Sequence, residues 1–234
     1  ADIRGAGSPT IRIRGVEKLH GAEHTVIPDR IEAATYAIAA AATDGEVTLL
    51  NAEPDHIQAI LHQLSQANVS CTVSGKEVTI KRKGELRPVS IATQPYPGYP
   101  TDAQAQLMAL MTQARGISII TERIFESRFM HVPELGRLGA HIELEGVSAI
   151  VEGGFELQGA HVMSSDLRAS AALVIAGLVA KSTTIISRIY HLDRGYEKMD
   201  VKLRNLGGDI GRWDSDPSKP NYRPVPPSLA QFVD

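Results

Sequence analysis

Three long apolar segments of the chain predict three buried helices, and each segment begins at an aspartate. The segments are RIEAATYAIAAAA after Asp29, AQAQLMALM after Asp102 and LRASAALVIAGLV after Asp166. Hydrophobic residues occupy almost every position of these segments and leave no polar stripe, and a helix of that kind belongs inside a domain. We therefore expect three central helices with other elements packed around them.

The same order of elements surrounds each of these helices, which predicts an internal repeat. A strand precedes the aspartate, a β-branched strand follows the helix (EVTLL, GISII and TTIIS), and an amphipathic second helix with a Leu-x-x-Leu pattern comes next. Closing strands are expected at ANVSCTVSG, GAHIELEG and GGDIGR. Because an internal repeat decides the architecture, we predict an α/β (α+β) domain of three βαβαββ-type repeats, at about residues 21–85, 86–153 and 154–212. With its helices inside and its sheets outside, this domain is an inside-out α/β barrel.

Both ends of the chain lie outside these repeats. Residues 1–20 contain a strand pair that is similar to the closing strands of a copy, and we expect them to be the end of a preceding domain or a linker. Since the first residue is Ala and not Met, we also expect the chain to be the C-terminal part of a longer protein. Residues 213–234 are rich in proline, which disfavours helices and sheets, so this segment is predicted to be an extended tail.

Composition narrows the class of protein. The chain is 43% hydrophobic and 22% charged, as globular proteins are, and its formal net charge is −3. Basic residues are spread along the chain and no apolar segment is long enough to span a bilayer, so we expect neither nucleic-acid nor membrane binding. The single cysteine, Cys71, excludes an internal disulfide and fits the reducing cytoplasm. The eight histidines follow no metal-ligand spacing, so we expect no metal site.

Charged residues gather at the junctions around the predicted helices. The three aspartates share this class of junction with five arginines: Arg30, Arg128, Arg168, Arg188 and Arg194. Helix N-termini and arginine side chains both bind phosphate and carboxylate groups, so the pattern predicts a site for an anionic ligand. In the alternative interpretation, the aspartates only cap their helices and the arginines form surface ion pairs. The residue pattern alone leaves both interpretations open.

Five motifs in order give the chain a specific resemblance. VIPDRIEAATY, YPTDAQAQ, FESRFMHVPEL, DLRASAALVIAG and RIYHLDRGYEK closely resemble the bacterial UDP-N-acetylglucosamine enolpyruvyl transferase family, also called carboxyvinyltransferases. The resemblance runs from about residue 9 to about residue 212. It implies an enzyme of two three-repeat domains with its substrates, phosphoenolpyruvate and UDP-N-acetylglucosamine, in the cleft between them. The implied reaction moves the enolpyruvyl group to the 3-hydroxyl of the sugar and releases phosphate, in the first committed step of peptidoglycan synthesis.

The resemblance also implies roles for individual residues. Asp102 matches the aspartate that contacts the sugar hydroxyl and acts as its general base, and Arg128 and Arg194 match arginines that face phosphoenolpyruvate. The other substrate-binding residues that it implies are Ile124, Phe125, Glu126, Asp29, Asp166 and Arg168. No cofactor and no metal are implied.

Part of the family's site has no counterpart in this chain. In the family, the proton-donating cysteine belongs to a loop of the other domain, and Cys71 cannot replace it because it lies in a predicted strand. We therefore expect the full-length protein to be an enzyme whose N-terminal domain is the partner of this half, and the chain alone to be inactive. Two alternatives remain: the enolpyruvyl transferase of the shikimate pathway, and a non-catalytic half that binds a nucleotide sugar or a partner. The segments RFMHVPEL and YHLDRGYE favour the first interpretation over the shikimate enzyme.

Overall fold

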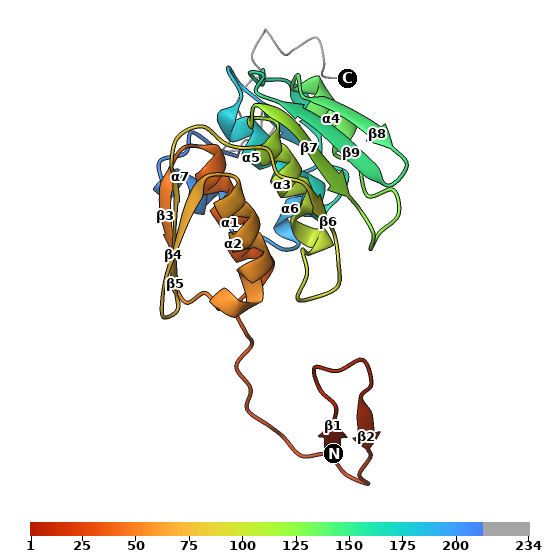
Figure 1. Cartoon of the computed structure of the whole chain (residues 1–234). Helices are drawn as coiled ribbons and strands as arrows, with labels where there is room; N and C mark the ends of the chain where they lie inside the picture. Colours follow the sequence, from red (N-terminus) through yellow and green to blue (C-terminus); the bar gives the residue numbers. More distant parts are fainter. Residues whose placement is uncertain (213–234) are drawn as a thin grey trace.

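Three apolar helices lie at the centre of the fold, as the sequence predicts. The computed structural model describes residues 1–212, and it places α1 (Arg30–Ala42), α3 (Gln104–Met111) and α5 (Leu167–Val179) in contact with one another (Figure 1). All eight residues of α3 are buried, including its two glutamines. Because alanine is the most frequent residue of α1, this helix packs closely against its neighbours without large side chains.

Shorter helices that follow the central ones have one buried face each. In α2, for example, the side chains at Ile60, Leu61 and Leu64 are buried while the glutamines around them are more exposed, as expected for an amphipathic helix. These helices are α2 (Gln58–Gln66), α4 (Val132–Arg137), α6 (Tyr190–Asp193) and α7 (Met199–Asn205), with the 3-10 turns η1 (Pro54–Ile57) and η2 (Thr101–Ala103).

Two sheets, in which most neighbouring strands are antiparallel, cover the central helices. The first sheet has the order β3-β5-β4 and packs on α1 and α2, and the second has the order β6-β7-β9-β8 and packs on α3 and α4. In β5, Val78 and Ile80 are buried while their neighbours are more exposed, which is the period of two expected of a strand with one covered face. The strands of these sheets are β3 (Glu46–Leu49), β4 (Val69–Ser74), β5 (Glu77–Arg82), β6 (Ile91–Ala92), β7 (Gly116–Thr121), β8 (His141–Glu145) and β9 (Ser148–Gly153).

A third, smaller sheet holds two parallel strands, β10 (His161–Met163) and β11 (Ile185–Ser187). The prediction of a strand in GGDIGR is wrong, because no strand forms within residues 207–212. Gly207 has a φ of 96°, the backbone N–H of Gly208 donates to the carbonyl of Leu203 in α7, and the N–H of Ile210 donates to the carbonyl of Gly208. A strand requires a neighbouring strand to complete its backbone hydrogen bonds, and within residues 1–212 this segment has none.

The N-terminal segment extends away from the body of the protein. β1 (Asp2–Arg4) and β2 (Arg12–Arg14) form an antiparallel hairpin, as the sequence predicts, and every residue from 1 to 29 is exposed (Figure 1). The prediction of a strand before Asp29 is also wrong, since residues 15–29 contain no strand. The corresponding strands before the other two aspartates do form, as β6 and β10, because each has a parallel partner.

The architecture is therefore a mixed α/β fold with a helical centre. Its strands form separate sheets, and within residues 1–212 these sheets do not join into a continuous barrel. In the same part of the chain, no helix combines the length and the apolar character needed to cross a lipid bilayer. The proline-rich tail predicted at 213–234 lies outside the described residues.

Candidate functional site

Two of the three recurring aspartates cap helices, and the third does not. The carboxylate of Asp29 accepts hydrogen bonds from the backbone N–H groups of Ile31 (2.7 Å) and Glu32 (3.1 Å) at the start of α1. Asp166 does the same at the start of α5, where Oδ1 accepts from the N–H groups of Arg168 (2.8 Å) and Ala169 (3.0 Å). Asp102 instead lies within the turn η2, one residue before the cap of α3, and its carboxylate bonds no backbone N–H among residues 1–212.

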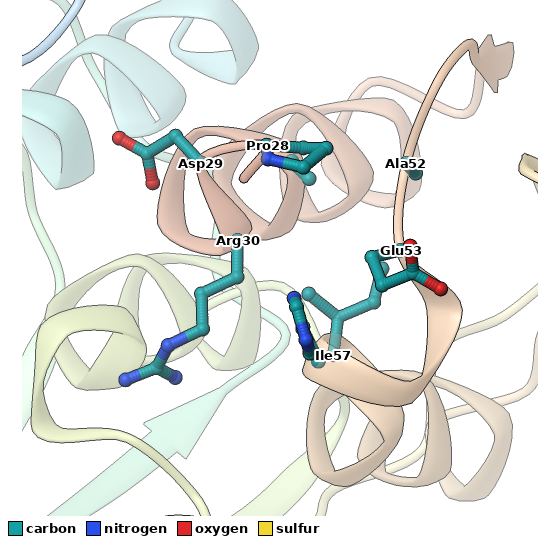
Figure 2. A pocket seen from close by; sticks show the side chains of 8 residues that line it. Pro28, Asp29, Arg30, Ala52, Glu53 and Ile57 are labelled. Atoms are coloured by element: carbon teal, nitrogen blue, oxygen red, sulfur yellow. The ribbon is translucent and has the colours of Figure 1, made fainter. Parts of the chain in front are cut away.

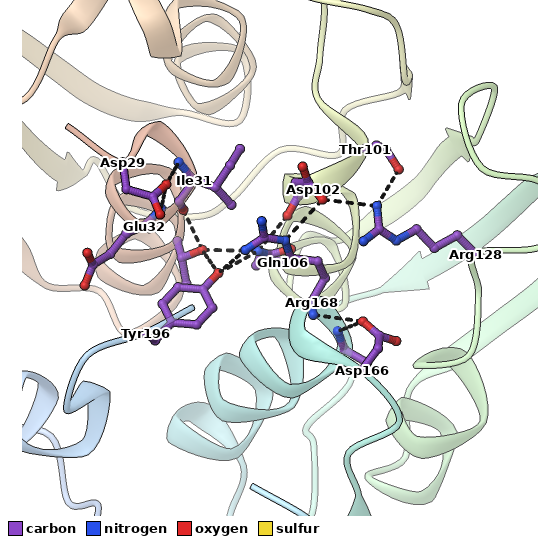
Figure 3. Close-up of polar contacts among 12 residues, drawn as sticks. Asp29, Ile31, Glu32, Thr101, Asp102, Gln106, Arg128, Asp166, Arg168 and Tyr196 are labelled. Carbon is purple, nitrogen blue, oxygen red and sulfur yellow. Dashed lines mark hydrogen bonds and ion pairs between the residues drawn. The ribbon is translucent and has the colours of Figure 1, made fainter. Parts of the chain in front are cut away.

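The carboxylate of Asp102 is held between two arginines. Its Oδ1 accepts from Nη1 of Arg128 at 3.2 Å and from Nε of Arg168 at 3.2 Å (Figure 3). Within the described part of the chain, the second carboxylate oxygen of Asp102 accepts no hydrogen bond. About a third of this side chain is exposed, so that the free oxygen is available to a ligand hydroxyl.

A cavity of about 500 Å³ opens beside this cluster. Arg194, the C-cap residue of α6, also lines this cavity and forms no ion pair within residues 1–212. Three arginines that converge on one cavity suit a ligand with phosphate and carboxylate groups. The residues that line the cavity are Asp102, Phe125, Glu126, Ser127, Arg128, Met130, Asp166, Leu167, Arg168 and Arg194.

The loop after β7 supplies one wall of the cavity. Phe125 is exposed, and its ring lies 5.1 Å from the guanidinium carbon of Arg128, close enough for a cation–π contact. Ile124 is exposed but does not line the cavity. The backbone N–H groups of both residues are already bonded to the carboxylate of Glu122, at 2.8 and 3.1 Å, so these two donors are not free for a ligand.

Asp29 lies apart from this cavity. It borders a small pocket of about 10 Å³ together with Pro28, Arg30 and residues around the start of α2 (Figure 2). A pocket of that size holds about one water molecule and no substrate. The structure therefore brings together seven of the nine residues predicted for the site, while Asp29 and Ile124 lie outside the cavity.

Comparison with known proteins gives the family. The sequence signature of the EPSP synthase family, described as EPSP synthase (3-phosphoshikimate 1-carboxyvinyltransferase), matches residues 1–203. The chain belongs to the EPSP synthase family. Asp102 and the three cavity arginines lie within the matched residues.

Individual relatives of the chain carry a more specific name than the family signature does. Over 213 residues the chain is 55% identical to a UDP-N-acetylglucosamine 1-carboxyvinyltransferase of Rhodopseudomonas palustris (strain BisB5), covering 91% of this chain and 50% of that protein. A protein of the same name from Koribacter versatilis is 53% identical over 212 residues, or 91% of this chain and 49% of that protein. The chain thus spans about half the length of the curated relatives it matches.

A solved structure of the same family supports the fold. The enolpyruvyl transferase NikO from Streptomyces tendae superposes with a TM-score of 0.77 at 31% sequence identity, over 90% of this chain and 51% of that chain. The mixed α/β fold of residues 1–212 is therefore the fold of an enolpyruvyl transferase.

The sequence analysis did not identify several polar residues that connect this cavity to the helical centre. Tyr196 is buried, and its hydroxyl meets Oγ1 of Thr35 at 2.8 Å, Nε2 of Gln106 at 3.3 Å and Nη1 of Arg168 at 3.5 Å (Figure 3). Gln106 also donates to the backbone carbonyl of Asp102 at 2.9 Å. A glutamine within the otherwise apolar segment AQAQLMALM is the signal that could have identified this network.

His131 is the buried ionisable group next to the site. Burial lowers its pKa to about 4, with Arg128 acting in the same direction and Asp166 opposing it. The imidazole is therefore neutral at physiological pH, and its Nε2 has no hydrogen-bond partner among the described residues. Residues 1–212 contain no group of three or more His, Cys, Asp or Glu side chains that could hold a metal ion.

Proposed function

We propose that this chain is the C-terminal half of a UDP-N-acetylglucosamine 1-carboxyvinyltransferase. The reaction moves the enolpyruvyl group of phosphoenolpyruvate to the 3-hydroxyl of UDP-N-acetylglucosamine and releases phosphate, which is the first committed step of peptidoglycan synthesis. It needs no cofactor and takes place in the cytoplasm. The relatives that are about 55% identical and carry this name support the proposal.

One observation carries the proposal: three arginines and one aspartate that caps no helix line the same cavity. Phosphoenolpyruvate carries a phosphate and a carboxylate, and each of these groups can bind a guanidinium. The cavity offers three guanidinium groups, those of Arg128, Arg168 and Arg194. A hydroxyl acceptor needs a carboxylate that is not already bonded to a helix N-terminus. Asp102 meets this requirement, whereas the carboxylates of Asp29 and Asp166 are occupied by backbone N–H groups.

In the proposed mechanism Asp102 is the general base. Its free oxygen takes the proton of the sugar 3-hydroxyl while the hydroxyl oxygen adds to C2 of phosphoenolpyruvate, and the proton donor of the other domain protonates C3 to a methyl group. Loss of a proton from this methyl group and of phosphate from C2 of the tetrahedral intermediate then gives the enol ether product. Arg128 and Arg168, which bond the carboxylate of Asp102, turn toward the phosphate and carboxylate when phosphoenolpyruvate binds and stabilise the charge of the intermediate. Arg194 reaches the same anion from α6.

The acceptor is proposed to lie along the loop after β7. Phe125 and Glu126 line the cavity there, and Ile124 adjoins them with an exposed side chain. Because the N–H groups of Ile124 and Phe125 are bonded to Glu122, this loop is proposed to contact the nucleotide sugar through carbonyl oxygens and side chains. Asp166 orients Arg168 as the cap of the helix that carries it, and Asp29 is assigned to the edge of the bound substrates.

The remaining features of the proposal concern the other half. We propose three repeats, at about residues 21–85, 86–153 and 154–212, in an inside-out α/β barrel, with residues 1–20 as the link to an N-terminal domain. That domain completes the cleft and supplies the proton-donating cysteine. Cys71 does not serve this purpose, because it lies on β4 and burial raises the pKa of its thiol, which disfavours the thiolate. The chain alone is therefore proposed to be inactive.

A chimeric enzyme tests the function. This chain replaces the matching half of the Rhodopseudomonas palustris relative, and phosphate release from isotope-labelled phosphoenolpyruvate is measured with UDP-N-acetylglucosamine or with 3-phosphoshikimate as the acceptor. We expect turnover with the nucleotide sugar only, no turnover by the chain alone, and loss of turnover in Arg194→Ala.

Each alternative has its own outcome in this assay. Turnover with 3-phosphoshikimate would support the shikimate-pathway enzyme. A folded chimera that binds UDP-N-acetylglucosamine without turnover would support a non-catalytic binding half. Turnover by the isolated chain would refute the requirement for a second domain.

A further inference from the structure

Glu122 is a buried carboxylate outside the cavity that lies directly after β7. Only 1% of the residue is exposed, yet its two oxygens accept four hydrogen bonds. Oε1 accepts from Oγ1 of Thr93 (2.6 Å) and from the backbone N–H groups of Ile124 (2.8 Å) and Phe125 (3.1 Å), while Oε2 accepts from Oγ1 of Thr101 (2.8 Å). Burial alone would raise the pKa of Glu122, but these hydrogen bonds outweigh it and lower the pKa below its ordinary value. The side chain is therefore ionised and acts only as an acceptor.

These four bonds join three separate segments at the wall of the site. Thr93 follows β6, Thr101 belongs to the turn that carries Asp102, and the two N–H groups belong to the loop that carries Arg128. Thr93 also accepts from the backbone N–H of Arg123 at 2.8 Å, so the loop is bonded twice at its start. The backbone N–H of Thr93 donates to the carbonyl of Thr121 at 2.9 Å and joins this segment to the end of β7, and the carboxylate of Glu122 extends the connection to Thr101 and to the loop.

The hydroxyl of Thr101 relays the effect of Glu122 to the arginine. Thr101 has one hydrogen to donate, and because Glu122 can only accept, the hydrogen points at Glu122. A lone pair of the same oxygen then faces Nη1 of Arg128 at 3.0 Å. That nitrogen also donates to Asp102 at 3.2 Å (Figure 3). The charge of Glu122 thus fixes the direction of a hydrogen-bond chain that ends at the carboxylate assigned to catalysis.

We propose that Glu122 is a positioning residue, which holds the 123–128 loop and, through Thr101, the guanidinium of Arg128 in the geometry required for substrate. The inference rests on the proposed function. The length and charge of glutamate both matter. An aspartate is one methylene shorter and cannot reach Thr93 and Thr101 together, and a glutamine directs an NH₂ donor at Thr101.

Glu122→Gln tests the proposal because it preserves shape and removes only the charge and one acceptor. In the chimeric enzyme, at a temperature well below the melting temperature (Tm), we expect the KM for phosphoenolpyruvate to rise about tenfold or more, since Arg128 loses its fixed orientation. Thr101→Val should also raise this KM, and the double variant should raise it by less than the product of the two single effects, because both changes interrupt one chain. Glu145→Gln on the exposed strand β8 is the matched control and should leave KM unchanged.

Amide hydrogen exchange in the chain itself provides a test that does not depend on turnover. In Glu122→Gln the amides of Ile124 and Phe125 should exchange about tenfold faster, because hydrogen bonds to a charged acceptor are stronger than those to a neutral one. Unchanged exchange, or a KM within twofold of the wild-type value, overturns the positioning role, and so do effects of the two substitutions that multiply. A wild-type chimera without turnover counts against the proposed function instead, and the exchange measurement then decides the role of Glu122.

Discussion

Replacing Asp102 by asparagine separates catalysis from stability at the centre of the site. The substitution keeps the shape of the side chain, removes one negative charge and leaves an amide that cannot take up a proton. It acts on the only recurring aspartate whose carboxylate is bonded to arginine side chains and not to a helix N-terminus, within residues 1–212. The expected consequences for unfolding and for turnover differ in size.

The stability effect is small because the two ion pairs are accessible to water. Asp102 is 34% exposed, and its partners Arg128 and Arg168 are 23% and 16% exposed. Pairs of this kind contribute at most about 1 kcal/mol each, and the amide oxygen of asparagine still accepts from one arginine. We therefore expect a loss of about 1 kcal/mol, which corresponds to a Tm about 2–4 °C lower for a domain of this size.

The effect on turnover is much larger if Asp102 is the base. General base catalysis contributes a factor of about 10² to 10⁴, so kcat in the chimeric enzyme should fall at least about a hundredfold. The assay measures phosphate release and thermal unfolding on the same preparation. Asp44→Asn, at an exposed aspartate that pairs with Arg82, is the matched control and should leave kcat unchanged.

Two results would refute this reasoning. A kcat within tenfold of the wild-type value removes the base role from Asp102. A Tm that falls by about 10 °C or more places the residue among the structural groups of the fold, and the loss of turnover then has another cause.

Two further predictions concern the scaffold. In Gly153→Ala the new Cβ would lie 2.1 Å from the backbone carbonyl oxygen of Met111, so β9 and the end of α3 must separate, and we expect a loss of about 3 kcal/mol in the free energy of unfolding. Gly136→Ala in α4 meets no atom within 4 Å and should stabilise by up to about 1 kcal/mol in the same denaturation experiment; equal effects of the two variants would contradict the packing argument. In Arg212→Gln the bidentate pair with Asp193 is lost. Hydrogen bonds from Arg212 lower the pKa of Asp193, so the pair stabilises above the ordinary aspartate pKa and ceases to do so as the pH falls through the lowered value. The Tm difference from wild type, which corresponds to at most about 1 kcal/mol at pH 7, should therefore shrink as the pH falls below the ordinary aspartate pKa, and a constant difference would show that the contact is not electrostatic.

The central helices could be predicted because their sequence pattern leaves one physical solution. A segment that is apolar on all sides must be buried, and an aspartate in front of it suits a helix cap. Asp29 and Asp166 are caps, as predicted. The strand predicted in 207–212 and the one before Asp29 failed for a reason that the local pattern does not contain, since a strand forms only where another strand completes its backbone hydrogen bonds.

The site could be predicted only in part from the sequence. Asp102 and five arginines were identifiable as charged residues at helix junctions. The structure places Asp102, Arg128, Arg168 and Arg194 around one cavity, whereas Arg30 and Arg188 do not line it. Glu122, Thr101 and Tyr196 were not identified, because their importance comes from contacts between residues far apart in the sequence. Nothing in the local pattern distinguishes a glutamate that orients a loop from one that lies on the surface.

The difference among the three aspartates explains how the predicted repeat can carry a single site. Asp29 and Asp166 each lie at a helix N-terminus, where backbone N–H groups satisfy the carboxylate. The turn η2 moves Asp102 off the cap position, and Glu122 bonds Thr101 in the same turn. The carboxylate of Asp102 is then satisfied by Arg128 and Arg168, whose side chains can leave it for an anionic ligand, whereas backbone N–H groups cannot. The chemistry is therefore expected at Asp102, the one of the three aspartates that does not cap a helix.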